Sequence, residues 1–484
     1  MSNLKTIFHN LFLFFKDKKQ VFVSLFRKNN KAYSLKEDSI LKLLIVFVGP
    51  AVLGMLVNIL YNVVDRIFVG QFVGAEGISA VTLVFPINFF QFGFVLLFGS
   101  GAGILIAKYL GENRLDKAEE VFGTMLAGLL IVMVLFTTAG LFFYEDILIL
   151  FGAEDLLLQL SKEYLFVIIL GFPLSFFIAL EFTCRAEGNP HLPAKLVLIS
   201  SLINVSLDYV FMKIFGLGVQ GAALATVIAQ GTNAVLLLYY YFNGKSLVKL
   251  VWKQIKLKKE IILPILAVGL APFVMDISVS FQNAFANHLL LESGGSDAVA
   301  VMGIIFGINV FFMMTALGTG DGMQPIISYN HGAKQYGRAL TTLKYVLVFV
   351  LFAAFLGITV IAFFPESIIG MFINDNAEIV TLTKSALEIF VISIPFFMIQ
   401  VVVTRYFQAI QKNTVATFLA ILRPVLLFIP ISYVLNSSYG LVGIWVAFVL
   451  SDSLAAIISL LLVKKYALKE NRRRQSNTTQ FVAE

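Results

Sequence analysis

Four polar residues in the first half of the chain stand inside otherwise apolar segments and have the chemistry to bind a cation. Asp65 lies in YNVVDRIFVG, Asn204 and Asp208 lie in INVSLDYVF, and Thr226 lies in GAALATVIAQ. Asn204 and Asp208 are one helical turn apart, so a helix places them on one face. Their oxygens could coordinate Na⁺, or repulsion between two nearby carboxylates could let one of them hold a proton near neutral pH. We therefore predict that these four residues form a cation-coupling site, which would also be a metal site if the ion is Na⁺.

Two of the acids in these segments also have plainer explanations. Asp65 is followed directly by Arg66, so the two could form an ion pair, or Asp65 could face water at the end of its helix. Asp208 has no basic residue beside it. A functional role therefore explains a buried acid at this position better than an ion pair does. Glu181 and Arg185 have helical spacing, and we interpret them as a structural ion pair.

The second half of the chain carries a different set of polar residues in its apolar segments. These residues are Asp276, Gln282, Asn283, Asn287 and Asp321. We predict that they contribute to a substrate site and that at least one of the two acids selects cationic substrates. A carboxylate attracts a cation more strongly in a partly desolvated cavity than in water. The alternative is that Asp276 caps irregular backbone near Pro272 and that Asp321 pairs within the helix bundle.

Sequence signatures of an enzyme are not found. The string NGKS at 243–246 resembles the end of a phosphate-binding loop, but that motif also requires a glycine at the position of Tyr239. The four histidines are scattered without the spacing of metal ligands. The single cysteine, Cys184, excludes an intramolecular disulfide. We therefore expect no catalytic residues and no cofactor, with H⁺ or Na⁺ acting as a coupling ion.

The whole chain is too apolar for a water-soluble protein. Of its 484 residues, 59% are hydrophobic and 13% are charged, and the mean hydropathy is +0.89. Soluble domains carry about 25% charged residues. The net charge of +7 does not require a nucleic-acid partner, because the basic residues gather in alternate connections between apolar segments. The composition predicts an all-α integral membrane protein whose partner is the lipid bilayer.

The first half of the sequence is repeated in the second half. Equivalent residues lie 221 or 222 positions apart in the pairs Pro50–Pro272, Asn62–Asn283, Gly99–Gly320, Pro173–Pro395 and Gly221–Gly443. A copy of about 200 residues accommodates about six crossings, which predicts twelve transmembrane helices in two pseudo-symmetric six-helix lobes. The predicted crossings are 41–68, 78–108, 120–143, 157–182, 193–215, 219–243, 262–291, 297–329, 340–364, 381–407, 414–436 and 441–465. In such repeats the substrate site lies near the bilayer midplane where the copies meet.

Basic residues lie mostly in the even-numbered connections and in the two terminal segments. Examples are Arg114 and Lys117 in the second connection, Lys334 and Arg338 in the eighth, and Arg405 and Lys412 in the tenth. The positive-inside rule then places both termini in the cytoplasm of a multi-pass cell-membrane protein. The predicted parts are a basic, amphipathic N-terminal segment (1–40), an N-lobe (41–243), a cytoplasmic linker (244–261), a C-lobe (262–465) and a cytoplasmic tail (466–484).

Several motifs together resemble the multidrug and toxic compound extrusion (MATE) family of cation-coupled exporters, particularly its bacterial MepA-type branch. They are YNVVDRIFVGQFVG, CRAEGNPHLPAK, INVSLDYVF, GVQGAALATVIAQ, GMQPIISYNHGAKQ and YFQAIQKN. The resemblance implies twelve helices in two lobes, V-shaped around a central cavity, and export driven by H⁺ or Na⁺. It also implies that the family's N-lobe cation site falls on the same four residues of the first half. Gln411 departs from the pattern, because such proteins often have glycine there.

We expect a secondary antiporter that exports amphipathic, mostly cationic organic compounds by alternating access and acts as a monomer. Aromatic, methionine and acidic side chains suit the binding of many flat cations. The alternative is a flippase for lipid-linked precursors from the same broader superfamily, which commonly has a strongly cationic cavity, whereas the intramembrane charges here are mainly acids. A channel or a membrane scaffold would not need paired acids that face a repeat interface.

Overall fold

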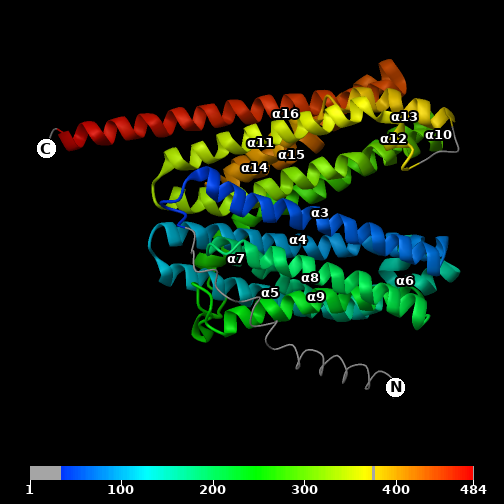
Figure 1. Ribbon diagram of the computed structural model, residues 1–484, viewed down its shortest axis with the longest axis horizontal. Coiled ribbons are helices and arrows are strands. Elements are labelled where there is room, and N and C mark those ends of the chain that lie inside the picture. Colours follow the sequence, from blue (N-terminus) through cyan, green and yellow to red (C-terminus); the bar gives the residue numbers. More distant parts are fainter. Residues whose placement is uncertain (1–33, 373–376, 483–484) are drawn as a thin grey trace.

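The computed structural model describes residues 34–372 and 377–482, which are mainly helical (Figure 1). The first half of the chain forms α3 (Ile40–Phe72), α4 (Ala75–Gly111), α5 (Leu115–Leu150), α6 (Asp155–Ser175), the 3₁₀-helix η1 (Phe176–Ala179), α7 (Leu180–Ala186), α8 (His191–Asp208), the π-helix η2 (Tyr209–Ile214) and α9 (Gly218–Phe242). The second half forms the 3₁₀-helix η3 (Trp252–Gln254), α10 (Lys259–Gly332), α11 (Tyr336–Phe363), α12 (Pro365–Ile369), α13 (Ala377–Phe390), α14 (Ile394–Ala409), α15 (Asn413–Ile421), the π-helix η4 (Leu422–Leu427) and α16 (Phe428–Val482). Most of the predicted amphipathic N-terminal segment lies outside the described residues.

The described residues contain the twelve predicted crossings. Ten helices are long and apolar enough to cross a membrane, and α13 and α14 together form an eleventh crossing that bends by 52°. The span Asn413–Leu468 counts once among the ten although it has 56 residues, and about 20 residues suffice for one crossing. Gly440 inside it has φ 55° and ψ −138°, outside the helical region. The chain therefore turns back at Gly440, and this span is two crossings.

The fourth crossing of each repeat is interrupted near equivalent prolines. Pro173 lies in the last turn of α6, which is followed by η1 and α7. Pro395 lies in the first turn of α14, directly after the bend from α13. Proline lacks a backbone donor and its ring clashes with the preceding turn, so it interrupts a helix. The crossing predicted at 381–407 is therefore two helices rather than one.

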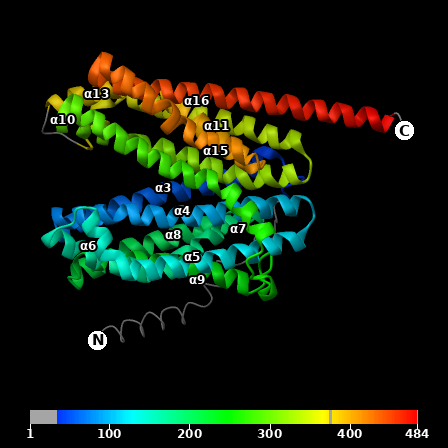
Figure 2. The same ribbon diagram turned by 180° about the vertical axis from the view of Figure 1, so that it is seen from behind.

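Buried side chains form two hydrophobic clusters, and each belongs mainly to one half of the chain. We call α3 to α9 the N-lobe and α10 to α16 the C-lobe. Figures 1 and 2 show the two lobes as two layers of roughly parallel helices that diverge toward the end opposite the C-terminus. This is the all-α, two-lobe architecture that the sequence predicts.

The first crossing of each lobe reaches into the other lobe. Leu43 and Phe47, near the start of α3, belong to the C-lobe cluster, whereas Val69 near its end belongs to the N-lobe cluster. Conversely, Ile265 near the start of α10 belongs to the N-lobe cluster, and Leu289 belongs to the C-lobe cluster. The lobes are thus joined at one end by two equivalent helices.

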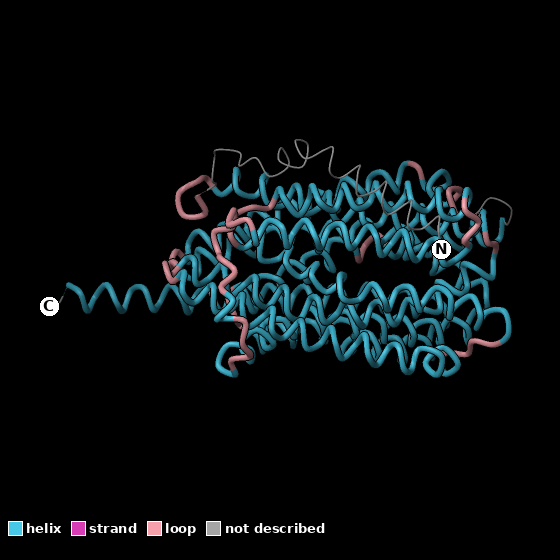
Figure 3. The backbone as a smooth tube through the Cα atoms, turned by 90° about the horizontal axis from the view of Figure 1, so that it is seen from below, coloured by secondary structure: helices cyan, strands magenta, loops and turns pink. Residues whose placement is uncertain are grey.

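The connections between crossings gather at two ends of the molecule, and the C-terminal helix projects beyond one of them (Figure 3). This end also carries the connections 112–114, 187–190, 243–258, 333–335 and 410–412. Because these connections include the basic residues that the sequence assigns to one side of a membrane, we call it the basic end. The starts of α3 and α10 lie at the same end.

Candidate functional site

Three N-lobe helices position the predicted cation-coupling residues. Asp65 lies in the C-terminal half of α3, and Thr226 lies within α9. Asn204 and Asp208 lie in the last two turns of α8, and Asp208 is the last residue before η2. A π-helical turn widens the hydrogen-bonding pattern and is frequent at functional sites. The change from α8 to η2 therefore marks the position of Asp208.

The structure places these residues inside the N-lobe with polar atoms that have no protein partner. Asn204 donates a weak hydrogen bond of 3.4 Å from Nδ2 to Oγ1 of Thr226. Asp65 is 8%, Asn204 1% and Asp208 0% exposed. Buried oxygens without a hydrogen-bond partner are Oδ1 of Asp65, Oδ1 of Asn204 and both carboxylate oxygens of Asp208. Buried polar atoms are normally satisfied, so these oxygens fit a proton or an oxygen-coordinated cation.

Asp65 interacts electrostatically with both Arg66 and Asp208, and the guanidinium of Arg66 also contacts an aromatic ring. The guanidinium of Arg66 lies over the ring of Phe85, 4.5 Å from the ring centroid. The carboxylates of Asp65 and Asp208 are close enough to interact electrostatically. The ion pair that the sequence left open for Asp65 is not among the ion pairs of the described residues.

Two tyrosines that the sequence does not single out lie near these acids. Tyr164 on α6 is 4% exposed and lies within electrostatic reach of both Asp65 and Asp208. Tyr61, one turn before Asp65 on α3, also lies close to it. A tyrosine hydroxyl can donate to a carboxylate or accept from an amide. In the sequence these tyrosines look like ordinary aromatic core residues, so no local signal distinguishes them.

The five polar residues of the second half differ in their burial and in their partners. Gln282 is 2% exposed and its Nε2 has no hydrogen-bond partner. Asp276 and Asn283 are half-buried, and Asn287 is exposed. Asp321 is 3% exposed and its Oδ1 lies 3.5 Å from Nη2 of Arg405 on α14. This is the pairing within the bundle that the sequence left open as the alternative for Asp321.

Arg405 corrects one expectation from the sequence. It was grouped with the basic residues of the tenth connection, but it lies inside α14 and is 4% exposed. Arg405 is buried by contacts with residues far away in the sequence. Asp321 offsets its positive charge, and Asp276 also lies within electrostatic reach. A buried guanidinium is tolerated when a carboxylate pairs with it. Hydropathy alone does not reveal such a partner.

A second buried ion pair faces this one across the boundary between the lobes. Arg185 donates from Nη2 to Oε2 of Glu181 over 3.0 Å, which confirms the predicted structural pair. Asn233 donates to the other oxygen of Glu181 over 2.8 Å. Ser100, Arg185, Asp321 and Gln324 are among the residues that line a cavity of about 10 Å³ between the lobes. That volume holds about one water molecule.

The donor set restricts the ions that the N-lobe site could bind. Among the described residues, no group of three or more His, Cys, Asp or Glu side chains could hold a metal ion. The site instead offers carboxylate, amide and hydroxyl oxygens, which are hard ligands. Such a set suits a proton on one carboxylate or a weakly held Na⁺.

Comparisons with known proteins identify relatives in both sequence and fold. A family model described as MatE matches residues 50–210 and 272–434, one segment in each repeat. The multidrug export protein MepA of Staphylococcus aureus strain MRSA252 is 29% identical over 451 residues, which is 92% of this chain and 97% of that protein. MepA of Staphylococcus saprophyticus is 28% identical over 444 residues with the same coverage.

Two solved structures share the fold. The crystal structure of MATE in complex with MaL6 has a TM-score of 0.87 at 24% identity. The outward-facing conformation of a multidrug resistance MATE family transporter of the MOP superfamily has a TM-score of 0.86, also at 24% identity. Each comparison covers 92% of this chain and 100% of the other chain.

Proposed function

This chain belongs to the MatE family of membrane transporters, and from that premise we propose that it is a secondary active multidrug exporter. It expels amphipathic, mostly cationic organic compounds in exchange for H⁺ or Na⁺ by alternating access. Export of this kind confers antibiotic resistance when the compounds are antibiotics. Proteins of similar sequence that carry the name multidrug export protein support the proposal.

The buried carboxylate of Asp208 is the observation that carries the coupling mechanism. Both of its oxygens lack a hydrogen-bond partner, and its side chain is wholly buried. An ionised carboxylate in this position is costly unless a cation accompanies it. Binding of H⁺ or Na⁺ removes that cost. The ion-bound and ion-free states of the site therefore favour different packing of the helices around it. Asn204 and Thr226 supply the neutral oxygens, and Asp65 supplies the second charge.

An aromatic surface that joins the lobes supports a flat organic cation as substrate. Phe94 on α4 lies 5.0 Å from Phe136 on α5 and 5.4 Å from Phe273 on α10, measured between ring centroids. Phe90 lies 5.6 Å from Phe136 and is 51% exposed. Ring faces attract cations, and they do so more strongly where water is excluded. Asp276 follows Phe273 by three residues on α10, so its carboxylate lies about one helical turn from Phe273.

The distribution of charge gives the proposed orientation in the cell membrane. By the positive-inside rule, the basic side chains in the connections at the basic end support the proposal that this end faces the cytoplasm. Both termini then lie on the cytoplasmic side. The lobes are joined at this end by α3 and α10 and diverge toward the other end (Figure 1). This arrangement corresponds to a state that is closed to the cytoplasm, with each chain acting as a monomer.

Transport by purified protein in vesicles tests the proposal. Proteoliposomes are loaded with a fluorescent organic cation, and efflux is followed after a proton gradient or a sodium gradient is imposed separately. Efflux that requires one gradient identifies the coupling ion. The proposal is contradicted if efflux is independent of both gradients. It is also contradicted if none of several organic cations is exported. A fluorescent lipid-linked precursor in the same vesicles tests the flippase alternative.

A further inference from the structure

The second crossing of each lobe meets its counterpart at the basic end without intervening side chains. A methyl group on Gly111, the last residue of α4, would collide with the backbone carbonyl oxygen of Tyr329 on α10. A methyl group on Gly332, the last residue of α10, would collide with the carbonyl oxygen of Lys108 on α4. At both positions the backbone of one helix therefore lies directly against the backbone of the other, with no room for a side chain between them. We call these two contacts the glycine crossing.

The two contacts are one contact repeated by the pseudo-symmetry of the molecule. Gly332 follows Gly111 by 221 positions, and Tyr329 follows Lys108 by the same 221 positions. The axis that relates the lobes therefore passes through the glycine crossing. A rocking motion of one lobe against the other acts on both contacts together. The Gly111 contact and the Gly332 contact therefore open and close at the same time.

Polar contacts support the same closure. Lys108 donates from Nζ to Oε1 of Gln411 over 2.9 Å, which links the end of α4 to the connection after α14. Gln411 has φ of 58°, a left-handed backbone conformation that L side chains rarely adopt. Farther from the basic end, Nε2 of Gln408 donates to Oγ of Ser100 over 3.0 Å. These bonds join the N-lobe to the C-lobe, and Ser100 is 1% exposed between them.

We propose that the glycine crossing is the cytoplasmic gate of the transporter, and that it must separate before substrate can enter from the cytoplasm. The inference rests on the proposed alternating access but concerns a different part of the molecule from the cation site. A backbone-to-backbone contact closes the path to water and involves few directional bonds. It can therefore open and re-form in each cycle at small cost. Gly111 and Gly332 are required because any larger residue holds the helices apart.

Alanine substitution isolates this effect because both glycines have helical backbone. Alanine is tolerated at least as well as glycine in a helical conformation, so the added methyl group is penalised across the lobe boundary rather than within its own helix. Gly303 on the second span of α10 is the matched control, because a methyl group there has no atom within 4 Å. Gly128 is a second control, because its methyl group would collide with the ring of Phe98 inside the N-lobe.

The test measures how readily the buried boundary becomes reachable from the cytoplasm. Cys184 is replaced by alanine, and Ile104, which lines the cavity between the lobes and is 3% exposed, is replaced by cysteine. Inside-out vesicles are then treated with a membrane-impermeant maleimide. We expect Gly111→Ala and Gly332→Ala each to raise the labelling rate by about tenfold. Gly303→Ala and Gly128→Ala should label at the parental rate. Size-exclusion chromatography in detergent shows which variants are folded.

Three outcomes decide the proposal. Labelling of Gly111→Ala and Gly332→Ala at the rate of Gly303→Ala overturns it. An equal rise in Gly128→Ala also overturns it, because labelling would then report a loosened lobe rather than an open gate. If Gly111→Ala does not fold, Gly332→Ala tests the same contact from the other lobe. Failure of the proposed function would appear separately, as a lack of drug efflux by the parental protein.

Discussion

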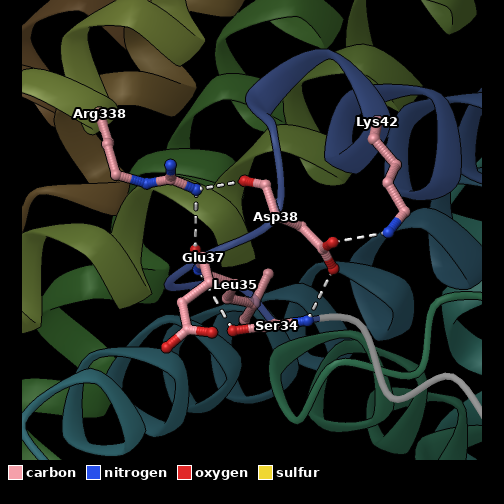
Figure 4. A network of polar contacts seen from close by, with 6 residues as sticks. All are labelled: Ser34, Leu35, Glu37, Asp38, Lys42 and Arg338. Carbon is pink, nitrogen blue, oxygen red and sulfur yellow. Dashed lines mark hydrogen bonds and ion pairs between the residues drawn. The ribbon is translucent and has the colours of Figure 1, made fainter.

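Arg338 donates a hydrogen bond of 2.6 Å from Nη2 to the backbone carbonyl oxygen of Asp38, which links the first turn of α11 to the segment before α3 (Figure 4). The same Nη2 lies 3.4 Å from the carbonyl oxygen of Leu35. Its Nε donates to Asn330, and Asn330 in turn donates to Leu35. The C-lobe thus holds the chain where it begins the first crossing.

An equivalent contact exists in the other lobe. The linker before α10 is held by the first turns of α5, where Glu120 pairs with Lys258 at 3.2 Å and Glu119 accepts from the backbone N–H of Lys249 at 3.3 Å. α5 and α11 begin at equivalent positions, Leu115 and Tyr336. The repeat therefore preserves the placement of the contact, although a guanidinium holds one segment and carboxylates hold the other.

Replacement of Arg338 tests the energetic value of this contact. We expect Arg338→Gln to lower the free energy of unfolding by about 1.5 to 3 kcal/mol, because hydrogen bonds from a charged group to partly buried carbonyl oxygens are lost. Arg338→Lys should restore only part of the loss, since lysine lacks the planar fork that reaches two carbonyls and Asn330. Thermal unfolding in detergent measures both. Lys344→Gln, at an exposed position of α11, is the matched control.

Asp208→Asn should abolish ion-coupled efflux while folding and membrane insertion stay intact. The substitution removes the charge that binds the ion, and it lowers the cost of insertion because a carboxylate in the membrane costs about 2.5 to 3.5 kcal/mol. Efflux from vesicles under imposed gradients should fall at least about tenfold. Asp146→Asn, at an exposed position, should transport as the parental protein does. Transport by Asp208→Asn at the parental rate with unchanged ion dependence would show that Asp208 is structural.

The two acids of the C-lobe should behave differently because their surroundings differ. Asp276 is half-buried, so Asp276→Asn should reduce efflux of a monovalent dye cation and spare a neutral compound of similar shape. Asp321→Asn leaves Arg405 unpaired and should lower the free energy of unfolding by about 3 to 5 kcal/mol. Replacing Arg405 by glutamine as well should recover part of that loss. Equal effects of Asp276→Asn on both compounds would contradict its role in selecting cations.

Burial of Glu187 beside the linker makes the stability of the folded chain depend on pH. It accepts backbone N–H bonds from Leu247 at 2.9 Å and Val248 at 3.1 Å. Burial raises the pKa of its carboxyl from 4.5 to about 7. A carboxyl whose pKa is raised by folding keeps its proton up to a higher pH in the folded chain than in the unfolded chain. The stability that protonated Glu187 gives is therefore full below about pH 4.5 and is lost as the pH rises to about 7.

Glu187→Gln should remove this part of the pH dependence. Glutamine keeps a carbonyl oxygen for the two N–H bonds and does not titrate. We expect the melting temperature of the parental protein to fall more steeply between about pH 5 and pH 7.5 than that of Glu187→Gln. The two melting curves are compared at each pH in the same detergent. Parallel pH profiles for the two proteins would show that Glu187 does not carry this dependence.

The sequence by itself determined the features that depend on local composition and spacing. Apolar runs of membrane length predicted the crossings, and the register of Pro50 with Pro272 predicted two lobes. A carboxylate in an apolar helix stands out because its burial is costly, so Asp65 and Asp208 were identified before their surroundings were known. The tertiary structure then placed them within electrostatic reach of one another.

Only the tertiary structure decided which distant residues meet. Tyr164 lies beside Asp65 and Asp208 in the proposed cation site, and Arg405 pairs with Asp321. Both are contacts between helices far apart in the chain. Gly111 and Gly332 are helical glycines like many others until the packing of the lobes brings a backbone carbonyl against each. Such contacts depend on the relative rotation and depth of whole helices, and those are fixed by the summed packing of many side chains rather than by any local pattern.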